Sequence, residues 1–263
     1  ATGQELKALE DQHGGSFHSI IGMFLDVEQV TRFDTGFAIT RLAQHAFCPS
    51  APAFQGLNRL ARYLATHMHS PIMYPRGKPK GHQIIKFEVE PGKFVEHKLT
   101  NQPCGCVDSD HARDIRTRKS ITCVKMFING VIVHWIFQNQ TRIAAHSIDA
   151  EIRAYFKGSQ FNTYWRMILE FMGQGMQEPT TIYEDNQPCI DIIRAGHITK
   201  LVKHIAIPVG MIKVEINRGH NLPVKIPGIL NPSDNGTKPN PGSTFHCLVR
   251  FCRGQRYYPP PGS

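Results

Sequence analysis

Hydrophobic residues recur at three- and four-residue spacing in some segments of the chain and alternate with polar residues in others. In the first hundred residues, helical periodicity covers 37–46 and again 54–64, with a proline-rich break between them. A segment rich in proline, glycine and lysine at 75–81 predicts a loop, and residues 83–99 predict one or two short strands. We therefore expect the chain to begin with a small, mainly helical region.

After residue 100 the pattern changes to strands and then to alternating helices and strands. Residues 119–128 and 131–137 are rich in β-branched and aromatic side chains, and Asn129-Gly130 between them is a strong hairpin signal. A long helical pattern follows, with Ser147 as its expected N-cap. A short strand is then expected at 180–183.

The later elements are marked by proline and glycine. A helix is expected from Pro188 to Gly196, whereas Pro208 and Gly210 interrupt the helical pattern at 204–218. A further strand and a final helix complete the order. Three antiparallel strands that lead into alternating helices and strands indicate a mixed α/β sheet covered by helices.

Composition sets the class and the expected division of the chain. The 263 residues, 41% hydrophobic and 19% charged, are typical of a folded globular protein with one large domain or two ordinary ones. We divide the chain into 1–100 and 101–263, with an extended tail at 257–261. No apolar run is long enough to span a membrane, and the start lacks a secretory pattern. We expect an intracellular protein of the cytoplasm, the nucleus or an organelle, with no membrane partner.

Charge and cysteine content narrow the partners. The formal net charge of +9 favours a polyanionic partner, and nucleic acid is the commonest one. The seven cysteines are odd in number, scattered and without a CxxC pair, which argues against a zinc ribbon or a disulfide framework. We expect reduced and mostly buried thiols.

Four acidic residues fall where the expected elements would bring them together. Asp108 ends a strand, Glu151 opens the long helix, Asp185 follows the strand at 180–183, and Asp234 is assigned to a later helix. Magnesium prefers oxygen ligands, and two such ions about 4 Å apart can clamp a phosphodiester between attacking water and leaving oxygen. Acids without an assigned role are also common nearby: Asp110, Asp149, Glu184 and Asp191.

The sequence around these acids resembles one family. VDSDHA and TRKSIT resemble the start of the ribonuclease H domain of copia-type LTR retrotransposon Pol polyproteins, and AHSIDAE, YEDNQ and KHI resemble its later motifs. The matching segments are 107–112, 117–122, 145–151, 183–187, 203–205 and 234–239. Residues 17–22, 31–34 and 60–64 resemble the C-terminal end of the reverse transcriptase that precedes this domain, although the polymerase's own aspartate motif is absent from the chain.

The resemblance implies a fold, a reaction and a set of site residues. The fold would be a ribonuclease H-like mixed sheet, preceded by a smaller helical remnant of the reverse transcriptase thumb or connection. The reaction would be cleavage of the RNA strand of an RNA–DNA hybrid by two magnesium ions, with manganese as the alternative ion. The implied catalytic and metal-binding residues are Asp108, Glu151, Asp185 and Asp234.

Three further polar residues are candidates for contact with the hybrid or with RNA. Asn186 and Gln187, beside Asp185, would reach a sugar or a base edge. His204 keeps its place in the KHI motif, where it is either on the substrate side or a buried structural histidine that donates to a backbone carbonyl.

Departures from the family pattern keep a second reading open. His111 stands where the family has Trp, Asp149 where it has Glu, and Ala206 where it has an acid, while Asn235-Gly236 interrupt the last motif. The alternative is therefore a domesticated, catalytically inactive module that binds nucleic acid or other protein subunits of a larger assembly. Transposase or integrase relatives use a different acid set, and no HExxH spacing supports a zinc enzyme.

Overall fold

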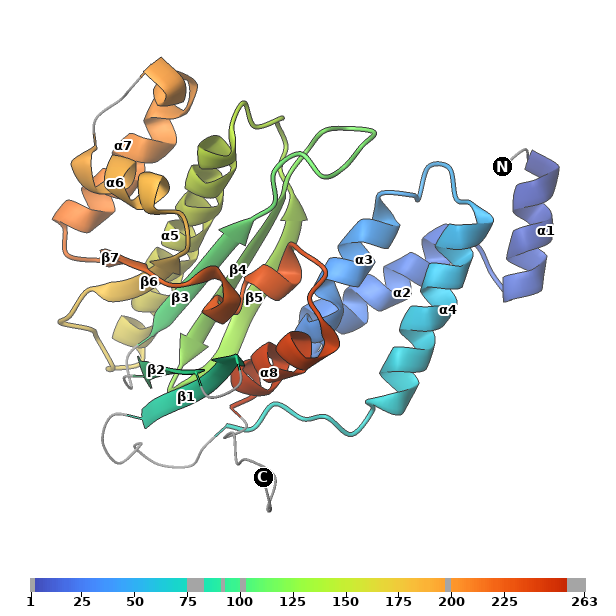
Figure 1. Ribbon diagram of the computed structural model, residues 1–263, viewed down its shortest axis with the longest axis horizontal. Helices are drawn as coiled ribbons and strands as arrows, with labels where there is room; N and C mark the ends of the chain where they lie inside the picture. Colours follow the sequence, from blue (N-terminus) through green and yellow to red (C-terminus); the bar gives the residue numbers. More distant parts are fainter. Residues whose placement is uncertain (1–2, 75–82, 91–92, 100–102, 197–199, 255–263) are drawn as a thin grey trace. The chain divides into compact units, whose positions relative to one another are not determined.

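The structure of the protein is a computed structural model (Figure 1). It describes residues 3–74, 83–90, 93–99, 103–196 and 200–254. The chain forms two compact units, Ala1–Pro71 and Ile72–Ser263. The loop expected at 75–81 and the tail expected at 257–261 lie outside the described residues. The assignment of residues 1–100 to a separate region stays a prediction.

The first unit is helical. Its helices are α1 (Gly3–His13), α2 (Phe17–Val30), α3 (Gly36–Ala43) and α4 (Ala51–Thr66), with a 3₁₀ turn, η1 (Phe33–Thr35), between α2 and α3. Both helices expected from periodicity, α3 and α4, are confirmed. Phe17 of α2 and Phe54 of α4 are fully buried and pack edge to face, with ring centroids 5.1 Å apart.

The second unit is built on a five-stranded mixed sheet in the order β5-β4-β3-β6-β7. Its strands are β3 (Cys104–Ser109), β4 (Ile121–Ile128), β5 (Val131–Asn139), β6 (Thr180–Glu184) and β7 (Asn221–Lys225). β3, β4 and β5 pair antiparallel, whereas β3, β6 and β7 pair parallel. The expected ribonuclease H-like arrangement of three antiparallel strands followed by alternating helices and strands is confirmed. A separate hairpin of β1 (Gln83–Glu90) and β2 (Lys93–Leu99) precedes it.

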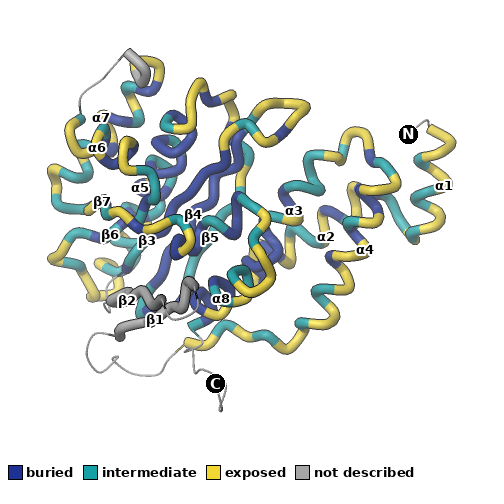
Figure 2. Tube along the Cα trace, viewed as in Figure 1, coloured by how far each residue is buried: buried dark blue, intermediate teal, exposed yellow. Residues whose placement is uncertain are grey.

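Helices cover both faces of the sheet (Figure 1). α5 (Ser147–Phe171), α6 (Gln187–Ala195) and α7 (Ala206–Asn217) lie on one face, and α8 (Gly242–Cys252) lies on the other. Buried residues concentrate in the central strands and in α5 (Figure 2). The main core consists of Val107, Val124, Met126, Ile152, Tyr155, Ile182, Cys189, Ile193, Ile205, Val209 and Ile212. On the opposite face, Phe127 of β4 packs against Phe251 of α8.

Local signals explain most element boundaries. Asn129 and Gly130 have φ angles of 53° and 74°, the left-handed pair that a two-residue hairpin turn between β4 and β5 requires. Gly196 ends α6 in the left-handed conformation, as expected. The seven cysteines are free thiols, and Cys48 is the exposed one.

One expectation about α7 and one about α5 are wrong. α7 runs through Pro208 and Gly210, because Pro208 is the third helical residue, where a backbone N–H has no intrahelical partner to lose. The residue before α5 is His146, and Ser147 is already helical, so Ser147 is not the N-cap.

Gly158 sets how closely α5 approaches the sheet. A Cβ at this position would lie 2.6 Å from Val107 Cγ1, and valine has little rotamer freedom with which to move away. We expect Gly158→Ala to lower the free energy of unfolding by about 1–3 kcal/mol, as overpacking does. Gly210→Ala in α7 is the matched control, because no atom lies within 4 Å of its Cβ position. Urea unfolding that shows equal midpoints for the two variants would contradict this packing.

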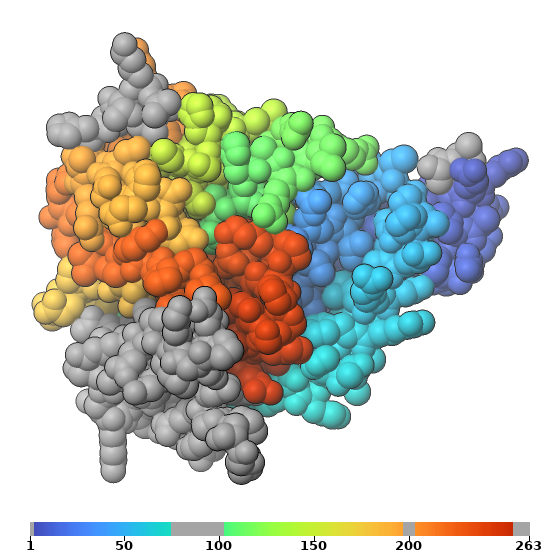
Figure 3. Space-filling view, viewed as in Figure 1, coloured from blue at the N-terminus to red at the C-terminus, as the bar shows by residue number. Residues whose placement is uncertain are grey.

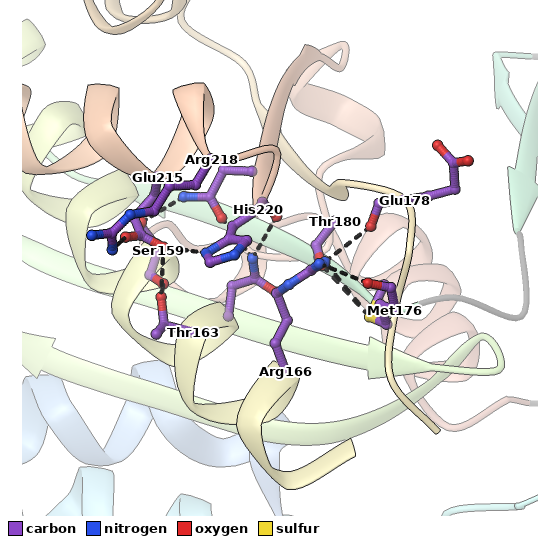
Figure 4. Close-up of polar contacts among 11 residues, drawn as sticks. Ser159, Thr163, Arg166, Met176, Glu178, Thr180, Glu215, Arg218 and His220 are labelled. Atoms are coloured by element: carbon purple, nitrogen blue, oxygen red, sulfur yellow. Dashed lines mark hydrogen bonds and ion pairs between the residues drawn. The ribbon is translucent and has the colours of Figure 1, made fainter. Parts of the chain in front are cut away.

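A polar network fastens the sheet at the end where β6 begins (Figure 4). Arg166 of α5 donates to the carbonyls of Met176 and Glu178, at 3.0 and 2.9 Å, and to Thr180 Oγ1 at 3.2 Å. Glu215 of α7 lies 2.8 Å from His220 Nδ1. These contacts fix the start of β6, so that the opposite end of the strand carries Glu184 and then Asp185 at a defined position.

Among the described helices, none has the length and apolar character needed to cross a membrane.

Candidate metal centre

Three of the four predicted acids meet on one side of the sheet. Asp108 lies near the end of β3, and Asp185 directly follows β6, the parallel neighbour of β3. Because adjacent parallel strands end at the same edge, these two side chains approach each other. Asp234 joins them, and one carboxylate oxygen from each of the three acids lies within 4.8 Å of the others.

The fourth predicted acid belongs to an overlapping group. Glu151 is buried in the second turn of α5, and its carboxylate lies within 4.8 Å of Asp185 and also of Glu184. Asp185 is therefore shared by both groups. The sequence motifs assign no role to Glu184, and the structure adds it to the site. The signal was available, because alternation along β6 places Glu184 on the same face as buried Ile182, toward α5.

Asp234 reaches the site on a turn rather than on the expected helix. It begins a 3₁₀ turn, η4 (Asp234–Gly236), before α8. The preceding loop is pinned to β3, where Asn231 Nδ2 donates to the Val107 carbonyl and Ser233 Oγ to the Cys106 carbonyl, each at 2.8 Å. These side chains satisfy the carbonyls of the last β3 residue paired with β6 and of the residue after it, and so they hold Asp234 beside Asp108.

A buried lysine of the sheet also binds the loop that carries Asp234. Lys125 of β4 is fully buried, and its Nζ donates to the Pro232 carbonyl at 2.7 Å and to Asn235 Oδ1. A buried ammonium needs such acceptors, because it loses its hydration shell. The contact links strand β4 to a segment more than a hundred residues later in the chain.

Lys238 lies within the acidic site. Its Nζ is 2.5 Å from Asp234 Oδ1 and 3.6 Å from Asp108 Oδ1. The Thr237 hydroxyl donates to Asp108 Oδ2. Although Lys238 is half-buried, which lowers its pKa, the neighbouring carboxylates of Asp108 and Asp234 outweigh burial and raise it. Sequence patterns alone predict no role for Thr237 or Lys238. In the space-filling view the part of the chain that follows β7, drawn in red, lies beside the loop that follows β3, drawn in green (Figure 3).

Burial perturbs the carboxylates. Asp108 is fully buried, and burial raises its pKa to about 7, against the lowering effect of Lys238. Burial also raises the pKa of Glu151, with further contributions from Asp108 and Asp185, and that of Glu184, with a contribution from Glu151. Protonation therefore favours the folded state, since burial disfavours the charged form.

This predicts how stability depends on pH. A carboxyl whose pKa is higher in the folded state contributes stability at low pH, and that contribution is lost as pH rises through the folded value, about 7 for Asp108. Without divalent cation, we expect Tm to fall by at least about 4 °C between about pH 5 and about pH 8, and millimolar magnesium to restore it at the higher pH. Thermal unfolding of Asp108→Asn is the control, and it should show a shallower decline. An unchanged slope in this variant would contradict the assignment.

The three residues predicted to contact substrate form hydrogen bonds within the protein. Asn186 caps α6, since its Oδ1 accepts from Cys189 N at 3.0 Å. Gln187 is exposed, and its Nε2 donates to Asp191 Oδ1 at 2.7 Å. His204 is neither buried nor bonded to a carbonyl, because its ring is 43% exposed and lies 2.8 Å from Asp149 Oδ2. His204 is a member of neither acidic group.

The donor set fits a hard divalent cation. Asp108 Oδ1, Glu151 Oε2 and Glu184 Oε2 are buried oxygens without a hydrogen-bond partner. A buried, charged oxygen of this kind is costly unless a cation compensates it. Carboxylate oxygens are the ligands that magnesium and manganese prefer.

Comparison with known proteins agrees with the family suggested by the sequence motifs. No protein-family model matches the chain. Over 229 residues, 87% of this chain, it is 24% identical to the retrovirus-related Pol polyprotein from transposon RE1 of Arabidopsis thaliana. The chain resembles transposon Pol polyproteins. It spans only 14% of that relative's length. Since the match is longer than the region 101–263, the Pol-like similarity extends into the first hundred residues.

Two further likenesses concern parts of this Pol-like chain. Over 142 residues it is 25% identical to secreted RxLR effector protein 161 of Plasmopara viticola, and the match covers 54% of this chain and 85% of the effector. A solved structure, that of LC11-RNase H1 in complex with RNA/DNA hybrid, aligns with a TM-score of 0.37 and 13% identity. That alignment covers 49% of this chain and 88% of the other.

Proposed function

We propose that this chain is a magnesium-dependent ribonuclease H that cleaves the RNA strand of RNA–DNA hybrids, as part of a retrotransposon-derived Pol protein. One observation carries the proposal. Carboxylates from β3, α5, the end of β6 and η4 converge in two groups that share Asp185. A shared carboxylate between two cation positions is the arrangement that two-metal phosphodiester cleavage requires.

The four sequence-predicted acids would hold the cations. Asp108, Asp185 and Asp234 would bind one ion, and Glu151 with Asp185 would bind the other. Two divalent ions in such a site supply an activated water and neutralise charge on the attacking and leaving oxygens. Magnesium is the expected ion, and manganese would replace it.

The chain's own groups prepare the carboxylates for this task. The Thr237 hydroxyl orients Asp108, and the buried contacts of Asn231 and Ser233 hold the turn that presents Asp234. Lys238 compensates part of the negative charge on the half of the site that contains Asp108 and Asp234. A site held this rigidly costs little reorganisation when substrate binds.

The surface beside the site suits a polyanion. The loop between β3 and β4 exposes Arg116 and Arg118, and the loop before α5 exposes Arg142. The two loops are joined by a 2.7 Å hydrogen bond from Gln140 N to the Ser120 carbonyl. Arginines at this edge would neutralise backbone phosphates, while a hybrid is distinguished from DNA by its 2′-hydroxyls. Gln187 and the side-chain amide of Asn186 are the proposed donors or acceptors to the sugar, and His204 is a more distant candidate.

The proposal is tested by a panel of labelled duplexes. An RNA–DNA hybrid, an RNA duplex and a DNA duplex of the same sequence are incubated with the protein and magnesium, and the products are separated by strand. We expect cutting of the RNA strand in the hybrid and none of the DNA duplex. Equal cutting of all three duplexes would contradict hybrid specificity.

Two observations favour a second function, an inactive binding module. Lys238 already pairs with Asp234 and lies near Asp108, so part of the acidic site is compensated by the protein itself. A protein named as a secreted effector is also similar to about half of this chain along most of its own length. Tight binding of the hybrid or of the RNA duplex in a gel-shift assay, with no cleavage of the same duplexes, would establish this alternative.

A further inference from the structure

Glu184 is a buried acid with one carboxylate oxygen that has no hydrogen-bond partner. Its side chain is fully buried at the end of β6. Oε1 accepts a hydrogen bond from Asn186 N at 2.9 Å, whereas Oε2 has no hydrogen-bond partner. The Asn186 N–H thus fixes the carboxylate through one oxygen and leaves the other available.

Glu151 lies close to Glu184 and also has a buried, unpartnered carboxylate oxygen. Its side chain is 7% exposed, and its Oε2 is buried without a hydrogen-bond partner. Oxygens of Glu151, Glu184 and Asp185 lie within 4.8 Å of one another. Two unpartnered, buried carboxylate oxygens at this separation repel each other unless a cation lies between them.

The two acidic groups differ in their internal compensation. Lys238 Nζ lies 2.5 Å from Asp234 and 3.6 Å from Asp108, so the first group already contains an ammonium. Within the described part of the chain, no ion pair to Glu151 or Glu184 is present. A divalent cation would therefore meet less electrostatic opposition in the group that contains Glu184.

We propose that Glu184 is a fifth metal-binding carboxylate, and that Glu151, Glu184 and Asp185 form the position that the first divalent cation occupies. This inference rests on the proposed nuclease site and goes beyond it, since the resemblance to the Pol family assigns no role to Glu184. The second cation then binds among Asp108, Asp185 and Asp234 and must displace Lys238.

The test is a titration of the full chain with Mn²⁺. Binding is measured by calorimetry and by the electron paramagnetic resonance signal of free Mn²⁺. Glu184→Gln keeps the shape of the side chain and removes its charge. We expect the first Mn²⁺ to bind at least about tenfold more weakly in this variant, because a direct ligand is lost. Asp234→Asn should weaken the binding of the second ion and leave the affinity for the first unchanged.

The matched control is Glu170→Gln, an exposed acid at the far end of α5, which should bind both ions as the wild type does. If Glu184→Gln unfolds, Glu184→Asp keeps the charge but withdraws the oxygen by one methylene, and it should also weaken the first ion. An unchanged first affinity in a folded Glu184 variant would overturn the inference while the nuclease proposal stands. Absence of Mn²⁺ binding to the wild-type chain would instead overturn the proposed metal site itself.

Discussion

Asp185→Asn is expected to abolish RNA-strand cleavage and to weaken the binding of both divalent cations. Asp185 is the one acid that both groups of carboxylates share, so its loss damages two cation positions at once. Because each ion contributes several kcal/mol to transition-state stabilisation, we expect a loss of at least about a thousandfold in kcat/KM. The measurement is the initial rate of hybrid cleavage at saturating magnesium.

Asp26→Asn is the matched control for this substitution. Asp26 is an exposed acid of α2 and belongs to neither acidic group, so the same chemical change there should leave the rate unchanged. Tm should be compared for both variants, since a misfolded Asp185→Asn protein would also be inactive. A folded Asp185→Asn variant that cuts RNA at the wild-type rate would contradict the proposed site.

Lys238→Met is expected to tighten binding of the second cation and to destabilise the cation-free protein. The Lys238 ammonium is close to Asp234 and Asp108, and it repels a divalent ion that approaches the same oxygens. Removing one positive charge at this distance, at a half-buried site, should increase the affinity for the second ion by about tenfold. Without cation, the three acids lose their internal counter-ion, and Tm should fall by about 2–4 °C.

These opposite effects distinguish a counter-ion from a merely structural lysine. Lys7→Met in α1 is the control, because Lys7 is exposed and belongs to the first compact unit, outside both acidic groups. Calorimetric titration with Mn²⁺ and thermal unfolding with and without magnesium provide both readouts. If Lys238→Met weakened the binding of the second ion, Lys238 would instead support the metal site. The proposed repulsion between Lys238 and that ion would then be wrong.

The parts of the fold that depend on local pattern could be predicted from the sequence. The Asn129-Gly130 turn and the helix that Gly196 ends follow from backbone preferences of single residues. Asp108 and Asp185 are expected together because each lies at the end of an expected strand, and β3 and β6 do pair parallel. Pro208 misled the prediction because the cost of proline depends on its position within a helix, and that position is set by where α7 begins.

The missing parts of the site depend on contacts between distant segments. Lys238 meets Asp108 only because Lys125, Asn231 and Ser233 fasten the loop before η4 to the sheet, and no local pattern encodes those contacts. Glu184 was visible as an acid on a strand. Its role depends on α5, which places Glu151 opposite it. Sequence periodicity predicts which face a residue occupies, but not which charged group will lie across from it.

The central claim is that these carboxylates form a divalent-cation centre that cuts RNA paired with DNA. It is tested most directly with a hybrid whose two strands carry different labels, incubated with the wild-type chain in magnesium and, in parallel, in EDTA. We expect the RNA strand to be cut in magnesium only, with the DNA strand intact in both reactions. An RNA strand that stays intact in magnesium, or that is cut equally well in EDTA, would contradict the account.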